Sequence, residues 1–298
     1  MRFTMLYPLP VTGGRSPFAA AQSVADLTRH ADAAGFSAIA FTEHPAPPED
    51  WMRSGGHESF DPLVTLAFCA AISPRIQLMP FLLVLPYHRP LMAAKSTTSL
   101  DVLSDGRLIV VAGAGYQEAE FLSLGVPFQD RNRIFDEALA QLRAAWTEDT
   151  VGEHKAALRP RPVQPSGPPI WIGGGSPLAR RRAALLGDGW SPNIYDVSRV
   201  SEIRYRMNSL EALERGIQEV LDLRREAGRN AEFDIQVMDL SKPSTIPSRI
   251  EVQAHVERLQ QLASMGVTWY VVQPPMHSVK DAVLAIEHYG DDVISAFR

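Results

Sequence analysis

A helix that ends in glycine and is followed at once by a short apolar strand recurs along the chain. Four examples are "SVADLTRHADAAG" before "FSAIAFTE", "KSTTSLDVLSDG" before "RLIVVAGAG", "PLARRRAALLG" before "DGWSPN", and "EVQAHVERLQQLASMG" before "VTWYVVQP". Glycine after a helix supplies the left-handed residue that closes the last turn. Strands that are apolar throughout are expected to be buried on both faces, and strands alternating with helices form a parallel sheet.

Eight strand regions of this kind fit a single (β/α)8 TIM barrel of the α/β class that spans residues 1–298. We expect the strands at residues 2–7, 37–43, 76–84, 107–113, 169–173, 188–193, 232–239 and 267–273. An open doubly wound sheet is the alternative architecture. No Gly-x-Gly-x-x-Gly follows the first strand, which disfavours a dinucleotide-binding Rossmann fold.

Two segments depart from this regular alternation. Residues 148–169 form an insertion loop without clear periodicity, and the prolines near its end predict a stiff, extended chain. A loop of this length in a compact fold is typical of a lid or a linker, and here we expect an insertion within one domain. Residues 198–228 are long enough to hold two helices.

Composition narrows the class of partner. The formal net charge is -5 and the pI is about 5.9, so we expect no nucleic-acid partner and no anionic membrane surface. The one cysteine, Cys69, precludes an intrachain disulfide and is expected in the core. No signal peptide or membrane-spanning run is evident, which predicts a cytoplasmic protein. Histidines at metal-ligand spacing are absent, so we expect no metal site.

The stretch "SAIAFTEHPAPPEDW" ends an apolar strand with a carboxylate and an imidazole, Glu43 and His44. In a TIM barrel the active site lies at the carboxyl ends of the strands, so this pair would stand at the catalytic face. An ion pair of Glu43 with Arg53 is the structural alternative. Trp51 and Met52 could form the wall of an apolar pocket or simply cover the barrel.

Three later strand ends add candidate binding residues. "QLMPFLLVLPYHRP" is the longest apolar strand and places the large residues Phe81 and Leu82 near its tip. "VVAGAGYQEAEF" has a small-residue turn, after which Tyr116 is expected to open a helix. "PPIWIGGGSPLARRRAALLG" runs from a strand through three glycines to Ser176 at a helix start, which is the arrangement of a phosphate site.

Taken together, these features resemble the bacterial luciferase-like flavin oxidoreductases, and more narrowly their coenzyme F420-dependent branch. The resemblance rests on "GFSAIAFTEHP", "DPLVTLAFCAAISPRIQL", "LVLPYHRPLMAAKSTTSLDVLSDGRLIVVAGAGYQEAEFLSLGVPF", "EALAQLRAAWTED" and "LRPRPVQPSGPPIWIGGGSP". It covers roughly residues 1–195 well and the remainder thinly.

The resemblance implies roles for individual positions. His44 would face the reactive side of the flavin as general acid or base, and Glu43 would orient or tune its imidazole. The other matching positions would bind the cofactor. Phe81 and Leu82 would form a non-prolyl cis peptide behind the ring, and the turn of Ala114, Gly115 and Tyr116 would contact the cofactor. Gly174, Gly175 and Ser176 would bind its phosphate.

Two departures from the family pattern concern the cofactor and substrate sites. Many relatives have Leu-Gly-Thr before the cis pair, whereas this chain has Leu78, Met79 and Pro80. The usual "FEG-Y" hairpin after Glu148 is replaced by "DTVGEHKAA", so a lid over the substrate is expected to differ.

The function that follows is hydride transfer between F420 and a small organic substrate. The alternative is an FMN-dependent monooxygenase that activates oxygen, and less favoured readings are a non-catalytic flavin-binding protein and a metal-dependent barrel hydrolase. Arg159, Arg161 and the arginines at 180–182 would suit the acidic tail of F420. By analogy with the family, a homodimer is expected through helices around residues 61–73 and 90–103.

Overall fold

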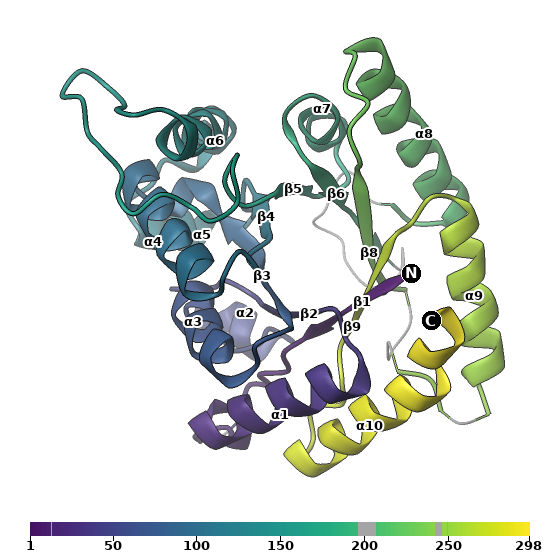
Figure 1. Cartoon of the computed structure of the whole chain (residues 1–298). Coiled ribbons are helices and arrows are strands. Elements are labelled where there is room, and N and C mark those ends of the chain that lie inside the picture. Colours follow the sequence, from purple (N-terminus) through teal and green to yellow (C-terminus); the bar gives the residue numbers. More distant parts are fainter. Residues whose placement is uncertain (13, 196–206, 242–245, 249) are drawn as a thin grey trace.

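Parallel strands form a closed ring in the part of the chain that the structure, a computed structural model, describes: residues 1–12, 14–195, 207–241, 246–248 and 250–298 (Figure 1). The strands are β1 (Arg2–Leu6), β2 (Ala38–Phe41), β3 (Gln77–Val84), β4 (Val110–Gly113), β5 (Ile170–Gly173), β6 (Gly189–Ser191), β7 (Asn193–Tyr195), β8 (Asp234–Leu240) and β9 (Trp269–Val272). Their order is β6-β5-β4-β3-β2-β1-β9-β8-β7, and pairing of β6 with β8 closes the ring. The predicted TIM barrel is therefore confirmed.

Each of the eight predicted strand regions contains a strand, but the sixth is divided. Pro192 separates β6 from β7, and because proline has no N–H to donate, a continuous ladder is interrupted there. After this break the chain continues as β7, which pairs with β8 through Asn193 and Met238. The barrel therefore has eight strand positions, of which the sixth consists of two short pieces.

Helices surround the barrel and follow the strands in alternation (Figure 1). They are α1 (Ala21–Ala34), α2 (Glu49–Arg53), α3 (Pro62–Ile72), α4 (Pro90–Leu103), α5 (Glu118–Ser123), α6 (Arg131–Thr147), α7 (Pro177–Leu186), α8 (Leu210–Glu226), α9 (Val252–Ser264) and α10 (Val279–Asp292). Short 3-10 turns cover Pro17–Ala19, Leu85–Tyr87, Phe128–Asp130 and Ile294–Phe297. Of the two helices expected within 198–228, the second is α8, and the residues up to 206 lie outside the described part.

The glycines predicted to end helices behave in two ways. Gly35, Gly106 and Gly266 have positive φ angles of 94°, 77° and 101°, which confirms their left-handed role. Gly187, after α7, has a φ of -87°, so the prediction was wrong for this position. A Cβ there would lie 3.0 Å from the carbonyl oxygen of Ala183. The backbone passes too close to Gly187 for a side chain, which explains why glycine occupies this position.

The amino end of the barrel is filled by two tryptophans. Trp171 and Trp269 lie near the starts of β5 and β9, are 1% and 0% exposed, and their ring centroids are 5.3 Å apart. The Arg2 guanidinium carbon lies 5.2 Å from the Trp269 ring centroid. This end of the barrel is therefore a packed core.

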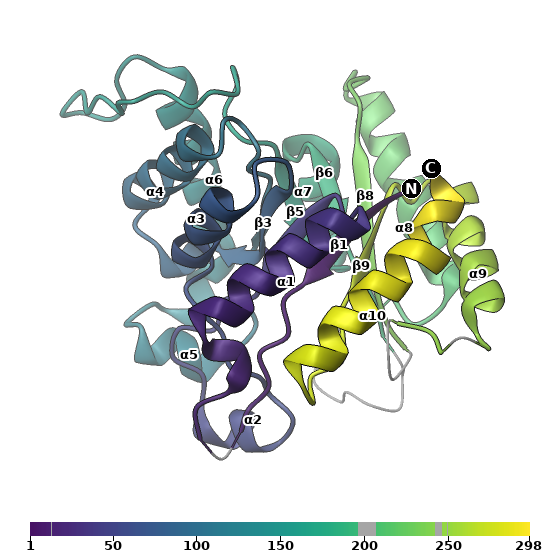
Figure 2. The same cartoon turned by 60° about the horizontal axis from the view of Figure 1, so that its bottom comes forward.

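The insertion at 148–169 joins α6 to β5 and lies at the amino end of the barrel. The buried carboxylate of Asp101 accepts hydrogen bonds from Val163 N and from the Gln164 side chain, both at 2.8 Å. The same Gln164 amide donates to Leu108 O at 2.9 Å, just before β4. Figure 2 shows the insertion at the opposite end of the molecule from α2 and α5. It is consequently not a lid over the carboxyl ends of the strands.

Candidate functional site

The chain after β2 brings Glu43 and His44 to the carboxyl end of the barrel, where they were expected. β2 ends at Phe41, and the two residues follow after Thr42. Their side chains are 6% and 11% exposed. Because all the strands are parallel, the tips of β3, β4 and β5 lie at this same end.

His44 is held by a buried carboxylate from the helix that follows β4. Its Nδ1 lies 3.1 Å from Glu120 Oε2, and the Glu120 side chain is 1% exposed. The same carboxylate accepts hydrogen bonds from Ala46 N and from the Tyr87 hydroxyl, both at 3.0 Å. With Nδ1 donating to a carboxylate, Nε2 is the His44 atom left to exchange a proton.

The electrostatics of this cluster follow from its hydrogen bonds. Burial acts to raise the pKa of Glu120, but the hydrogen bonds from His44, Ala46 N and Tyr87 outweigh it, so the pKa is lowered from its ordinary value. Burial, followed by the charge of Glu120, raises the pKa of Tyr87 far above its usual range. Near neutral pH, Glu120 is therefore an anion and Tyr87 a neutral hydrogen-bond donor.

Glu120 and Tyr87 are the residues of this cluster that sequence reasoning missed. Glu120 lies within the stretch "VVAGAGYQEAEF", but an acidic residue in the first turn of a helix is typical of a partner for the helix dipole. Its contact with His44 joins residues 76 positions apart. A search for carboxylates that follow other strand ends of the barrel, including β4 two strands away from β2, would have found it.

Both oxygens of Glu43 bind groups other than His44, whose imidazole the resemblance expected it to orient or tune. Its Oε2 accepts a hydrogen bond from Val84 N at 2.6 Å, and its Oε1 lies 2.8 Å from His88 Nε2. Burial acts to lower the pKa of His88, but the hydrogen bond and charge of Glu43, with the charge of Asp61, raise it overall. The expected role of Glu43 in orienting His44 is thus wrong, and Arg53 pairs instead with Glu49.

Aromatic side chains surround the His44 ring. The Trp51 ring centroid lies 4.5 Å away, that of His57 5.2 Å and that of Tyr116 6.1 Å. His57 donates from Nδ1 to Glu58 O at 2.9 Å. Burial is the largest of the effects that together lower the pKa of His57, so its imidazole is neutral near pH 7. No pattern in the sequence distinguishes His57 as a site residue.

Leu82 lies between the tips of two further strands. The peptide bond between Phe81 and Leu82 is cis, as the resemblance implied. A Cβ on Gly113 would come within 2.5 Å of Leu82 Cδ1, and one on Gly173 within 2.5 Å of Leu82 Cδ2. The glycines at the ends of β4 and β5 therefore provide the space that the Leu82 side chain occupies. Met79 is fully buried in the barrel interior.

The turn after β4 places Ala114, Gly115 and Tyr116 beside this site. Ala114 is half-buried, Gly115 has a φ of 75°, and Tyr116 is 58% exposed. A Cβ on Gly115 would lie 2.6 Å from the Phe121 ring, so the turn is tight against α5. Tyr116 does not open the helix as predicted, because α5 begins at Glu118.

The glycine turn after β5 leads into the amino terminus of α7. Gly174 has a φ of 98°, and its N–H donates to Ser191 O at 3.1 Å. Ser176 is the N-cap residue, and its Oγ accepts from Ala179 N at 3.1 Å. A Cβ on Gly174 would meet Ala179 Cβ at 3.6 Å and nothing closer, so the backbone is open on that side. Gly175 lies between them, half-buried.

This turn fits an anionic group such as a phosphate. The first amides of a helix have no acceptor within the helix, and its dipole favours negative charge. The Ser176 hydroxyl has a hydrogen to donate even while its oxygen caps α7. The residues present are therefore compatible with the phosphate that both FMN and F420 carry.

The arginines suggested for an acidic tail are mostly engaged elsewhere. Arg182 is 6% exposed and forms an ion pair with Asp136 at 2.7 Å. Arg161 lies in the insertion at the amino end, 3.0 Å from Asp149. Arg180 donates to Gly175 O at 2.7 Å and pairs with Glu219. Of these residues, Arg180 is the one that contacts the glycine turn.

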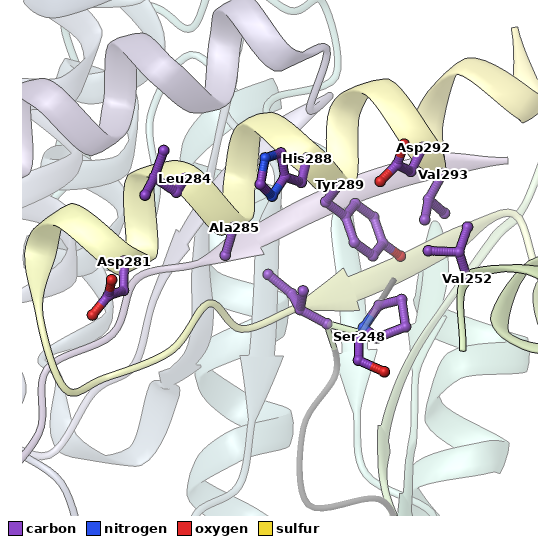
Figure 3. Close-up of a pocket in the computed structure, with 11 residues that line it drawn as sticks. Ser248, Val252, Asp281, Leu284, Ala285, His288, Tyr289, Asp292 and Val293 are labelled. Carbon is purple, nitrogen blue, oxygen red and sulfur yellow. The ribbon is translucent and has the colours of Figure 1, made fainter. Parts of the chain in front are cut away.

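A separate hollow of about 250 Å³ lies in the outer helical layer (Figure 3). It is formed by α10, including His288 and Tyr289, and by Ser248 and Val252. No predicted site residue lines it, and it is a different place from the His44 cluster. Over the described residues, no helix could cross a bilayer, and no three His, Cys, Asp or Glu side chains gather as a metal site would require.

Comparison with known proteins points to one family. The sequence profile described as luciferase-like monooxygenase matches residues 1–266. The uncharacterized protein Rv0940c of Mycobacterium tuberculosis is 27% identical over 296 residues, covering 90% of this chain and 93% of that protein. The F420-dependent glucose-6-phosphate dehydrogenase of Intrasporangium calvum is 28% identical over 182 residues, covering 57% and 53%.

A solved structure supports the same fold. The monooxygenase RslO1 from Streptomyces bottropensis superposes with a TM-score of 0.83 at 17% identity, and the match covers all of both chains. Agreement of this kind over the full length confirms the barrel architecture derived above.

Proposed function

The chain belongs to the luciferase-like monooxygenase family, and from that premise we propose that it transfers a hydride between coenzyme F420 and a small organic substrate. The observation that carries this proposal is the pairing of His44 with the buried Glu120 at the same end of the barrel as the open glycine turn before α7. A proton-exchanging imidazole and an anion-binding turn are two parts that a flavin-type oxidoreductase needs together.

The chain's own residues would hold the cofactor in three places. Gly175 and Ser176 would bind the phosphate through their backbone amides and the hydroxyl, and Gly174, whose own N–H donates to Ser191 O, would let the phosphate approach the backbone. Phe81 and Leu82 would lie behind the ring, and the turn of Ala114, Gly115 and Tyr116 would lie along its edge. When bound, the deazaflavin supplies the two-electron acceptor or donor that no protein side chain provides.

His44 would move the proton that accompanies this transfer, at Nε2. Glu120 is a positioning residue, because it fixes Nδ1 and stabilises the imidazolium that forms when Nε2 takes a proton. Trp51 and His57 would exclude water from the same region, since their rings lie 4.5 and 5.2 Å from the His44 ring. The F420-dependent relative from Intrasporangium calvum supports this cofactor.

An FMN-dependent monooxygenase is the second candidate function. It is favoured by the full-length likeness to the monooxygenase RslO1, and the glycine turn alone suits either phosphate. A third possibility is a flavin-binding protein without turnover.

Fluorescence titration of the apoprotein with F420 and with FMN tests these candidates. Micromolar binding of F420 with FMN far weaker supports the proposal, and the opposite preference moves the protein to the monooxygenase function. Tight retention of a flavin without turnover by any reductant would indicate a binding protein. Binding of neither cofactor would overturn the flavin-type function altogether.

We further propose a homodimer formed through α3 and α4. Val64 and Phe68 on α3 are 69% and 40% exposed, and Leu91 and Met92 on α4 are 39% and 64% exposed. Large apolar side chains gathered on adjacent helices are typical of a contact surface. Light scattering after gel filtration should give twice the chain mass, and the M92E variant should shift that mass toward the monomer.

A further inference from the structure

The buried carboxylate of Glu43 is directed at β3, although it neighbours His44 in the sequence. Both oxygens are engaged, one by Val84 N at 2.6 Å and the other by His88 Nε2 at 2.8 Å. The Glu43 side chain is 6% exposed, and that of His88 is 26% exposed. A charge-assisted contact to a backbone amide, removed from water, fixes the position of that backbone.

The backbone that Glu43 fixes carries Leu82. Val84 is the last residue of β3, two positions after Leu82. The pairing of β3 with β4 shifts register between Phe81 and Leu83, so the ordinary ladder is interrupted at this tip. Val84 is nevertheless in register with Gly113, one of the two glycines against which Leu82 lies. Glu43 thus supplies an anchor where the strand itself is irregular.

We propose that Glu43 is a positioning residue for the cofactor platform: it holds the tip of β3 so that Leu82 stays between the ends of β4 and β5. This inference rests on the proposed function, since the platform is where the ring would lie. It assigns the two carboxylates of the site to different partners. Glu120 acts on the imidazole of His44, and Glu43 acts on the backbone that would support the ring.

His88 completes this arrangement as the hydrogen-bond partner of the second Glu43 oxygen. The charges facing His88 are Glu43, to which it bonds, and Asp61, the cap of α3, which acts at longer range. Burial opposes the imidazolium, and the two carboxylates favour it more strongly, so its pKa is raised. A neutral amide at position 43 would keep an acceptor for Val84 N and remove this charge.

The first test uses the apoprotein and needs no cofactor. In E43A, amide exchange at Val84 should become about tenfold faster or more, because its acceptor is lost. In E43Q, that exchange should stay near the wild-type rate, while the His88 pKa measured by NMR should fall, because the charge that favours its imidazolium is removed. The exposed E137Q variant is the matched control and should change neither. Unchanged Val84 exchange in E43A would overturn the proposal.

The second test separates Glu43 from Glu120 in the loaded enzyme. E43A should weaken F420 binding about tenfold or more, and E43Q should restore the affinity to within about threefold of wild type. At saturating F420, the pH profile of kcat in E43Q should follow the wild type, whereas E120Q should shift it. A shift in E43Q that equals the one in E120Q would mean that Glu43 acts through His44 and would overturn the inference.

Failure of the proposed function would look different. Wild-type protein that binds neither F420 nor FMN would refute that function and with it a cofactor platform, and the apoprotein results would still report whether Glu43 holds β3.

If E43A does not fold, H88A is the second variant. It leaves Val84 bonded, so binding should fall by about threefold. Full wild-type affinity in H88A, with a shifted pH profile in E43Q, would again contradict the proposal.

Discussion

The two ends of the barrel are built from the same strands but differ in how their polar groups are used. At the amino end, Trp171 and Trp269 fill the interior, and Asp101 satisfies the backbone and side chain of the insertion. At the carboxyl end, His44 has one nitrogen bound and the other available. The amino end is therefore a packed core with the insertion bonded to it, and the carboxyl end retains groups for a ligand, which is the division expected of a TIM barrel.

Removing His44 should give the largest effect, and that effect should be on turnover, since His44 lies at the carboxyl end of the barrel. We expect H44A to lower kcat by about 10²- to 10⁴-fold, the usual contribution of a general acid or base. Cofactor affinity should stay within a few-fold of wild type, because the phosphate turn lies after β5. Steady-state kinetics and a fluorescence titration measure the two quantities. Unaltered turnover in H44A would remove the proton-transfer role.

Removing Asp101 should affect stability and leave catalysis in place. D101A would leave Val163 N and the Gln164 amide without their buried acceptor, so we expect a loss of about 2–4 kcal/mol in the free energy of unfolding. Urea denaturation measures this, and kcat of the folded fraction should match wild type. A fall in kcat as large as that of H44A would show that the two ends are coupled.

The Glu120 carboxylate should make a smaller, pH-dependent contribution. Its pKa in the folded protein is lowered, so its stabilisation is present above the unfolded pKa of about 4.3 and is lost as pH falls through the folded value. E120Q should therefore cost stability at pH 7 and progressively less as the solution is acidified below pH 4. Urea midpoints between pH 7 and pH 3 test this; a constant difference between the two proteins would contradict it.

The smallest effect is expected from shortening the insertion. Val151 and Ala156 pair across its outer turn, at the end of the barrel away from His44. Replacing residues 152–155 with a two-residue Asn-Gly turn should leave kcat and KM within about twofold of wild type, since the segment is exposed and lies at the other end of the barrel. A large rise in KM would show that the insertion acts on substrate binding, and would contradict the assignment of function to the carboxyl end alone.

The fold could be predicted from the sequence more fully than the site. Apolar strands and glycine-ended helices are local patterns, and they located each strand region and the strand end that carries His44. The pairing of His44 with Glu120 joins the segment after β2 to α5 and is a tertiary contact that no local pattern encodes. Adjacent residues such as Glu43 and His44 need not act together, and here their side chains bind different elements.

The place of the insertion at the amino end follows from the order of the elements along the chain. A segment that joins a helix to the next strand must lie at the amino end of a (β/α)8 barrel, because each helix returns the chain to that end. The length and the prolines of residues 148–169 are typical of a lid or a linker, but their position between α6 and β5 excludes a lid over the carboxyl ends of the strands. The order of helix, insertion and strand along the chain therefore predicts the position of the insertion better than its length or proline content does.

The contact of Leu82 with Gly113 and Gly173 has an evolutionary consequence. One leucine fills the space that side chains on two different strands would otherwise require. An alanine at either glycine would displace it, and a smaller residue at position 82 would leave a void beside both. Substitutions at these three positions should therefore be tolerated in combination rather than singly. Homologous sequences should show compensating changes at the three positions, which lie on three strands.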